Sequence, residues 1–166
     1  MDKKAILKGI QAEFESVGVT CDWMDEGEAS PVDLLITAHE GLGLFGENAM
    51  GEYFFMHYDR AAEDTEYFVC MISTEEEVTT EDPAALIDAV NRLNYYIPYG
   101  SFMVTPENEV MLKMCSPISG SIPQEAAAKQ INTLIAHALD LFQRRIGLLS
   151  DVAAGKVTPE EVDELF

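Results

Sequence analysis

Residues 32–58 read VDLLITAHEGLGLFGENAMGEYFFMHY and decide the fold, because they join two apolar segments through a glycine-rich loop. The segments at 32–39 and 52–58 each have the length and composition of a β-strand. The loop at 41–46, GLGLFG, matches the G-x-G-x-x-G fingerprint of dinucleotide-binding proteins, which must follow a strand and open a helix. Whether a helix follows this loop therefore decides between a parallel and an antiparallel sheet.

The space after the loop is too short for such a helix. In a true fingerprint the helix N-terminus holds the pyrophosphate, and the crossover to a parallel strand takes about a dozen residues or more. Only residues 47–51 separate Gly46 from the second apolar segment, and Gly51 lies where the helix would form. Glu40 and Glu47 flank the loop and would repel phosphate. We therefore predict a connection between antiparallel strands, and no nucleotide or other cofactor.

The apolar residues of this loop have two interpretations. Leu42, Leu44 and Phe45 either cover one end of the sheet or form part of an exposed recognition surface. The sequence leaves both open.

The rest of the chain follows helical or strand periodicity. Apolar spacing predicts helices at 2–17, 82–97 and from 121 to Gly147 or Gly155, and strands at 19–25, 32–39, 52–58, 66–73, 101–105 and 110–115. Asp2 can cap the first helix, Asp82-Pro83 is a typical helix start, and Ser121 with Gln124 has capping-box spacing. Strands in runs with helices between them indicate an α+β fold with a single antiparallel sheet and flanking helices, in the order α-β-β-β-β-α-β-β-α. We expect one domain at 1–147 and a C-terminal helical tail at 148–166.

Charge restricts the possible partners. Thirty acidic and ten basic residues give a net charge of −20 at pH 7, and Arg60 is the one base between Cys21 and Asp82. This negative field repels the backbone of nucleic acids and anionic membrane surfaces, so we predict neither as a partner. The field either attracts a basic protein partner or only keeps the protein soluble.

The sequence also indicates a cytoplasmic protein with free thiols. No apolar run reaches the roughly 18 residues of a membrane span, and Lys8 interrupts any N-terminal signal segment. Cys21, Cys70 and Cys115 lie far apart without a C-x-x-C pair, which argues against a disulfide framework and a zinc site.

Catalytic signatures are absent from the sequence. No G-x-S-x-G, H-E-x-x-H or phosphate-binding loop occurs, and His39, His57 and His137 have no metal or triad spacing. We therefore predict that the protein is not an enzyme and holds no metal. The alternative is a small-ligand binder or an enzyme with a carboxylate pair that only the fold brings together.

Apolar residues in the strands point to binding. Tyr53, Phe54, Phe55 and Met56 are consecutive, so they put bulk on both faces of a sheet. One face packs on the helices, and the other must meet another helix, a second subunit or a guest chain. These features predict a non-enzymatic protein-binding module.

The segment at 91–102, NRLNYYIPYGSF, followed by VMLKM at 110–114, resembles the bacterial YbjN-like family. This family has the type III secretion chaperone-like fold, with the order α-β-β-β-α-β-β-α, and the present chain has one additional strand. The resemblance covers about residues 2–147 and consists of a pattern of elements, without a chemical signature. It implies a small, acidic, cytoplasmic homodimer without ATPase activity that binds an extended segment of a partner, or a sensory or regulatory role.

The resemblance also implies candidate binding residues. The non-core side of the helix at 82–97 becomes the dimer surface, with Ile87, Asn91, Asn94 and Tyr95, and the aromatic strand becomes the guest surface, with Tyr53 and Phe55. The alternative is that these residues simply pack within a monomer. A further hypothesis makes the protein a subunit of a larger complex, whose tail docks through Val162, Leu165 and Phe166.

Overall fold

We describe the protein from a computed structural model, in residues 1–58, 64–75, 77, 78, 80 and 82–165. The helices are α1 (Lys3–Ser16), α2 (Pro83–Tyr96) and α3 (Gln124–Ala153), with short 3₁₀ turns η1 (Leu44–Gly46) and η2 (Pro159–Asp163). The strands are β1 (Thr20–Met24), β2 (Leu34–His39), β3 (Ala49–Met56), β4 (Thr65–Thr74), β5 (Ser101–Val104) and β6 (Val110–Ser119). The predicted α+β class and the order α-β-β-β-β-α-β-β-α are confirmed.

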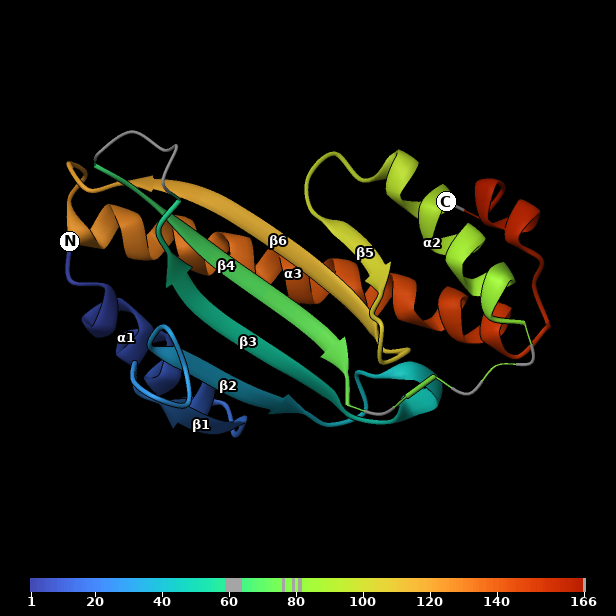
Figure 1. Cartoon of the computed structure of the whole chain (residues 1–166), viewed down its shortest axis with the longest axis horizontal. Coiled ribbons are helices and arrows are strands. Elements are labelled where there is room, and N and C mark those ends of the chain that lie inside the picture. The colour runs from blue at the N-terminus through green and yellow to red at the C-terminus, as the bar shows by residue number, and fades with distance from the viewer. Residues whose placement is uncertain (59–63, 76, 79, 81, 166) are drawn as a thin grey trace.

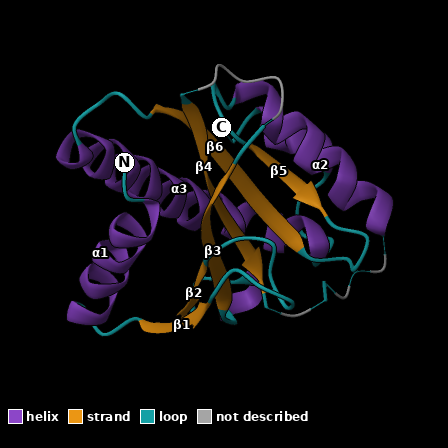
Figure 2. Ribbon diagram, turned by 60° about the vertical axis from the view of Figure 1, so that its left-hand side comes forward, coloured by secondary structure: helices purple, strands orange, loops and turns teal. Residues whose placement is uncertain are grey.

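The six strands form one antiparallel sheet in the order β1-β2-β3-β4-β6-β5 (Figure 1). The helix α3, 30 residues long, crosses behind the sheet, with α1 beside β1 and α2 beside β5 (Figures 1 and 2). All three helices contribute to a single cluster of buried side chains, together with one set of alternating strand residues. One face of the sheet therefore carries the helices and the core.

The local signals for helix starts are confirmed for two of the three helices. The carboxylate of Asp2 accepts a hydrogen bond from the Ala5 N–H (2.9 Å), and that of Asp82 accepts one from the Ala85 N–H (3.0 Å). The capping box predicted at Ser121 is wrong, because the residue that precedes α3 is Pro123 and it makes no side-chain cap. The Ser121 hydroxyl lies 2.7 Å from the Ser119 hydroxyl instead.

The C-terminal part of the chain continues the same core. The helix α3 runs through Gly147 and ends before Gly155, whose φ of +67° suits glycine. The side chain of Val162 in η2 is 0% exposed and belongs to the core cluster. The expected division at residue 147 thus falls inside a continuous helix.

The glycine loop leads directly into a strand. Its second half forms the three-residue turn η1, and β3 begins at Ala49, three residues before the predicted start at 52. Leu44 is 2% exposed and Leu42 packs partly against the core, which supports the first interpretation for these two residues. Phe45 is 53% exposed, and its N–H donates to the Ser150 hydroxyl (3.1 Å), so the loop packs against α3.

Three polar side chains are buried together between α1 and the sheet. The Thr37 hydroxyl lies 2.7 Å from His39 Nε2, and the Tyr53 hydroxyl lies 3.3 Å from the same nitrogen. The ring of Phe14 on α1 packs edge-on against His39, with 5.6 Å between the ring centroids. Gly51 leaves room for this group, because a Cβ there would come within 2.5 Å of both hydroxyl oxygens. The group is satisfied internally by its own hydrogen bonds.

Burial of His39 predicts a pH-dependent stability. Burial lowers the pKa of His39 below 6.5, whereas in the unfolded chain the pKa stays near 6.5. The unfolded state therefore binds more protons between these two values, and stability is lost as the pH falls through this window. We expect denaturant unfolding to show a smaller loss of stability between pH 7 and pH 5 for His39→Gln than for the wild type. The variant His137→Gln, at an exposed position, should keep the wild-type loss, and equal losses for all three proteins would contradict the prediction.

Candidate protein-binding surface

The second face of the sheet has no helix on it in the part of the chain that the structure describes. Along β3, buried residues alternate with half-buried ones, so that every second side chain points away from the core. We call this surface the open face. Its residues are Thr20, Asp22, Met24, Leu34, Ile36, Ala38, Met50, Glu52, Phe54, Met56, Thr65, Tyr67, Val69, Met71, Ser73, Ser101, Met103, Met111, Lys113, Cys115, Pro117 and Ser119.

Strand register arranges the open face in rows that cross the sheet. The first row is Met24, Leu34, Phe54, Val69 and Cys115, the middle row is Asp22, Ile36, Glu52, Met71, Lys113 and Ser101, and the third row is Thr20, Ala38, Met50, Ser73, Met111 and Met103. Val69 is 0% exposed yet lies outside the core cluster, in register with Phe54 and Cys115 on the open face. The open face thus has an apolar centre of its own.

Methionine is the characteristic residue of the open face. Six of the eight methionines of the chain lie on it, namely Met24, Met50, Met56, Met71, Met103 and Met111. Methionine side chains are flexible and polarisable, and they adapt to the shape of a binding partner. A contiguous apolar surface of this kind typically marks a protein interaction site.

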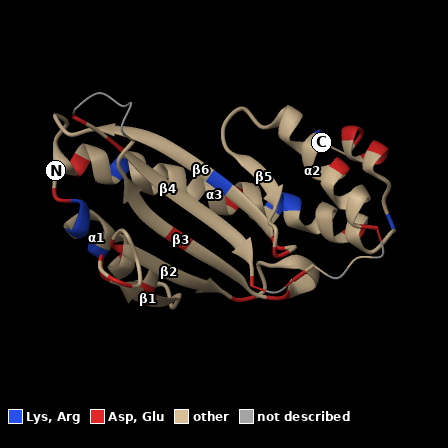
Figure 3. Cartoon of the chain, viewed as in Figure 1, with Lys and Arg blue, Asp and Glu red and all other residues tan. Residues whose placement is uncertain are grey.

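Two opposite charges flank the centre of the open face. Glu52 on β3 and Lys113 on β6 each pair in register with Met71, from opposite sides of β4 (Figure 3). Among the described residues, neither side chain has a hydrogen bond or an ion pair. Burial, and then the nearby charge of Glu109, raise the pKa of Glu52. Both charges are therefore available to a partner.

The predicted guest residues do not lie on this surface. Tyr53 is 0% exposed and Phe55 is 5% exposed, and both belong to the core cluster. The expectation that they bind a guest segment is therefore wrong. The physical reason is strand parity, since the neighbouring residues Phe54 and Met56 point to the open face instead.

The predicted dimer residues on α2 separate into two groups. Ile87 (48% exposed) and Tyr95 (86% exposed) point outward together with the exposed Asn91, at helical spacing. Asn94 is half-buried, and its amide makes two hydrogen bonds of 2.8 Å with the backbone N–H and C=O of Phe102 in β5. The structure thus places Asn94 in an internal contact and leaves the other three as an exposed strip.

The tail is docked on α2. Arg92 forms ion pairs with Asp163 (2.6 Å) and Glu160 (3.6 Å), and the Tyr96 hydroxyl lies 3.3 Å from the Asp163 carboxylate. Burial of Val162 removes it as an anchor for a partner, so that part of the docking hypothesis is wrong. Leu165 is 57% exposed, and Phe166 lies outside the described residues.

A hollow near the start of β2 and the end of β3 is lined in part by polar side chains. It has a volume of about 360 Å³, and Lys3, Glu26, Asp33 and His57 contribute to its lining. The Asp33 carboxylate accepts a hydrogen bond from the Glu26 N–H (3.1 Å) and lies 3.7 Å from Lys4 Nζ. These contacts hold the turn before β2, so the carboxylate has a structural role there. The alternative of a small-ligand binder or an enzyme with a carboxylate pair, for which the sequence named no residues, stays a prediction.

Sequence reasoning missed most of the open-face methionines. Met50, Met103 and Met111 each lie next to a core-facing residue in their strands. Because side chains alternate along a strand, their place on the open face can be read only once the core-facing residues are known. For Lys113, the only signal in the sequence was a charged residue within an otherwise apolar strand. The register that joins these residues across β3, β4 and β6 is a tertiary property.

Comparison with known proteins finds similarity in structure and none in sequence. No family model matches the chain, and no curated protein matches it. A crystal structure of YbjN from E. coli, a protein proposed to regulate transcription, is similar over 92% of this chain and 94% of that chain, with 12% identity and a TM-score of 0.44. The expected likeness to YbjN is thus found in the structure only, and membership of the family stays a prediction. Among the described residues, no helix is long and apolar enough to cross a membrane.

Proposed function

We propose that the chain is a non-enzymatic, cytoplasmic protein-binding module that acts through the open face. The observation that carries this proposal is the gathering of six methionines on a sheet face that no described helix covers. Removal of apolar surface from water supplies the free energy of such an association, about 25 cal/mol for each Å² buried before the costs of binding. A role in regulation or as a chaperone would follow from the partner that binds.

The negative charge of the chain affects the choice of partner. Most acids lie outside the open face, which carries only Asp22, Glu52 and the base Lys113 among its residues. A partner must therefore match an apolar centre flanked by Glu52 and Lys113, with Asp22 at the β1 edge. Nucleic acid, which binds through clustered basic residues, is a poor match.

Site-specific photo-crosslinking tests this proposal. A benzophenone amino acid replaces Met71, at the centre of the open face, and the same group replaces the exposed Lys129 on α3 as the control. Irradiation of cells that produce each full-length variant should give a discrete covalent protein adduct from position 71 and none from position 129. The mass of the adduct identifies the partner as a second copy or another protein. Equal, diffuse labelling from both positions would overturn the proposal.

A further inference from the structure

We infer that the partner on the open face is a second copy of this chain, related by a two-fold axis that runs along β4, so that Glu52 of each copy faces Lys113 of the other. This inference rests on the proposed function and names the partner of the same surface. It follows from the placement of the two charges and from the register of the rows.

The two charges beside β4 in the middle row are complementary to their own two-fold copies. Glu52 and Lys113 lie one strand away from Met71 on opposite sides, in β3 and β6. A two-fold axis that runs parallel to β4, midway between two stacked sheets, places β3 of one copy over β6 of the other. Each residue keeps its height along the strand direction. The axis therefore brings each Glu52 opposite a Lys113, and the two Met71 side chains meet at the centre.

The same charges exclude the other simple arrangement. An axis across the strands at the level of Met71 would place Glu52 opposite Glu52 and Lys113 opposite Lys113. Like charges brought together and desolvated are costly, whereas the opposite pairs compensate one another. Sheets that pack face to face keep their strands within about 30° of each other, which the axis along β4 satisfies with a small inclination.

The neighbouring rows are also compatible with this axis. In the third row it places Met50 opposite Met111, and Ala38 opposite Met103. In the first row it places the large Phe54 opposite the smaller Cys115. Large side chains thus meet small or flexible ones, which allows the two faces to interdigitate.

Charge reversal tests the inference in the full-length chain. Sedimentation velocity in 0.3 M NaCl, where the Debye length is about 6 Å, reduces the general repulsion between two chains. We expect the wild type to dimerise, and each of Glu52→Lys and Lys113→Glu to raise the dissociation constant at least about tenfold. The double variant Glu52→Lys/Lys113→Glu should return to within about threefold of the wild type, since the pairs are restored with reversed sign.

Matched controls change the net charge equally at positions away from the open face. Glu125→Lys and Lys129→Glu, both at exposed positions on α3, should leave the dissociation constant unchanged. Circular dichroism verifies that every variant is folded. A wild type that stays monomeric at 100 μM, or a double variant that does not recover, would overturn the inference.

The proposed function can survive that result. A monomer whose residue at position 71 still crosslinks to a different protein would overturn the second copy and support the binding module. A dimer that is insensitive to both reversals would assign self-association to another surface, such as the strip with Ile87 and Tyr95, and would overturn the inference. Monomeric behaviour together with no specific adduct would overturn both.

Discussion

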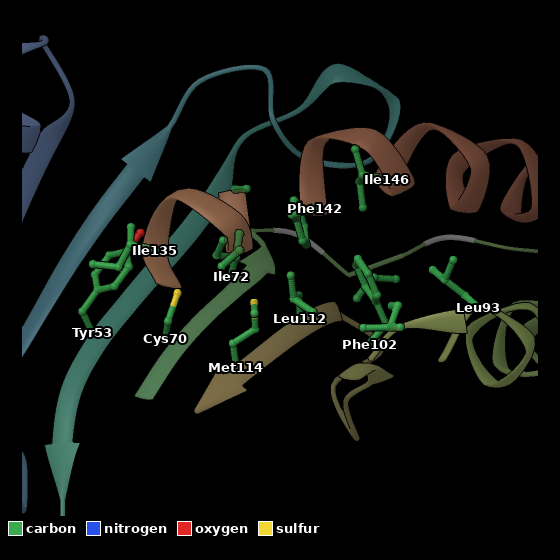
Figure 4. Close-up of a cluster of buried hydrophobic side chains, with 14 of the residues drawn as sticks. Tyr53, Cys70, Ile72, Leu93, Phe102, Leu112, Met114, Ile135, Phe142 and Ile146 are labelled. Carbon is green, nitrogen blue, oxygen red and sulfur yellow. The ribbon is translucent and has the colours of Figure 1, made fainter. Parts of the chain in front are cut away.

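Phe142→Ala is expected to lower the free energy of unfolding by about 3–5 kcal/mol, the usual cost of removing a buried phenylalanine side chain. Phe142 on α3 is 0% exposed and stacks on Phe102 of β5, with 5.9 Å between the ring centroids. Figure 4 shows the Phe142 side chain pointing from α3 into the cluster that contains Leu112 and Phe102. The ring connects the longest helix to the edge of the sheet, so its removal leaves a cavity between two layers that cannot collapse easily.

Thermal and denaturant unfolding measure this effect. For a chain of this length, the loss corresponds to a decrease in melting temperature of roughly 6–20 °C. Leu141→Ala is the matched control, because Leu141 is the adjacent residue on α3 and is only half-buried. We expect the control to lose clearly less stability. A loss below about 1 kcal/mol for Phe142→Ala would show that the layers are not held as described.

Elements with local signals could be predicted from the sequence. Asp2 and Asp82 cap their helices because an N-cap depends on residues three positions apart. The antiparallel sheet followed from the short distance between Gly46 and the next strand, which leaves no room for a crossover helix. Both inferences depend only on local features, namely the number of residues between two elements and hydrogen bonds within one helical turn. They therefore do not require knowledge of the tertiary structure.

The face of each strand residue could not be predicted in the same way. In β3 both parities are apolar, with Tyr53 and Phe55 on one side and Phe54 and Met56 on the other. The choice between them depends on the tertiary structure, because Tyr53 joins the buried polar group with His39 while Phe54 pairs with Val69 on the open face. A one-residue difference in parity exchanges the core and the candidate site. Sequence reasoning therefore found the correct strand and named the wrong residues in it.

The role of Asn94 could not be found from the sequence for a related reason. The family resemblance implied that Asn94 lies on the non-core side of α2 as a dimer residue, but its amide contacts a strand that comes after the helix. The contact depends on how the chain turns back after α2, at Pro98 and Gly100. The φ of Gly100 is +82°, a conformation that suits glycine. The hydrogen-bond partner of Asn94 is therefore set by the packing of α2 against β5, which the local sequence does not reveal.

Asn94→Ala is expected to lower the free energy of unfolding by about 1–3 kcal/mol, because it leaves the Phe102 N–H and C=O without partners at a position that is 2% exposed. Since the Phe102 N–H donates to Asn94, this N–H points away from β6, at the outer edge of the sheet. The asparagine amide thus occupies the place of a neighbouring strand and closes this edge. Exposed edges are sites of pairing with other chains.

A short series of variants separates this contact from the general loss of a polar residue. Asn94→Asp keeps an acceptor for the Phe102 N–H but loses the donor to the Phe102 carbonyl, so we expect a destabilisation similar to or larger than that of Asn94→Ala. Asn91→Ala, one turn earlier at an exposed position, should change stability by less than about 0.5 kcal/mol. Denaturant unfolding measures the three values at one protein concentration. Equal effects of Asn91→Ala and Asn94→Ala would mean that the two amides are equivalent and that the edge of β5 is closed by other means.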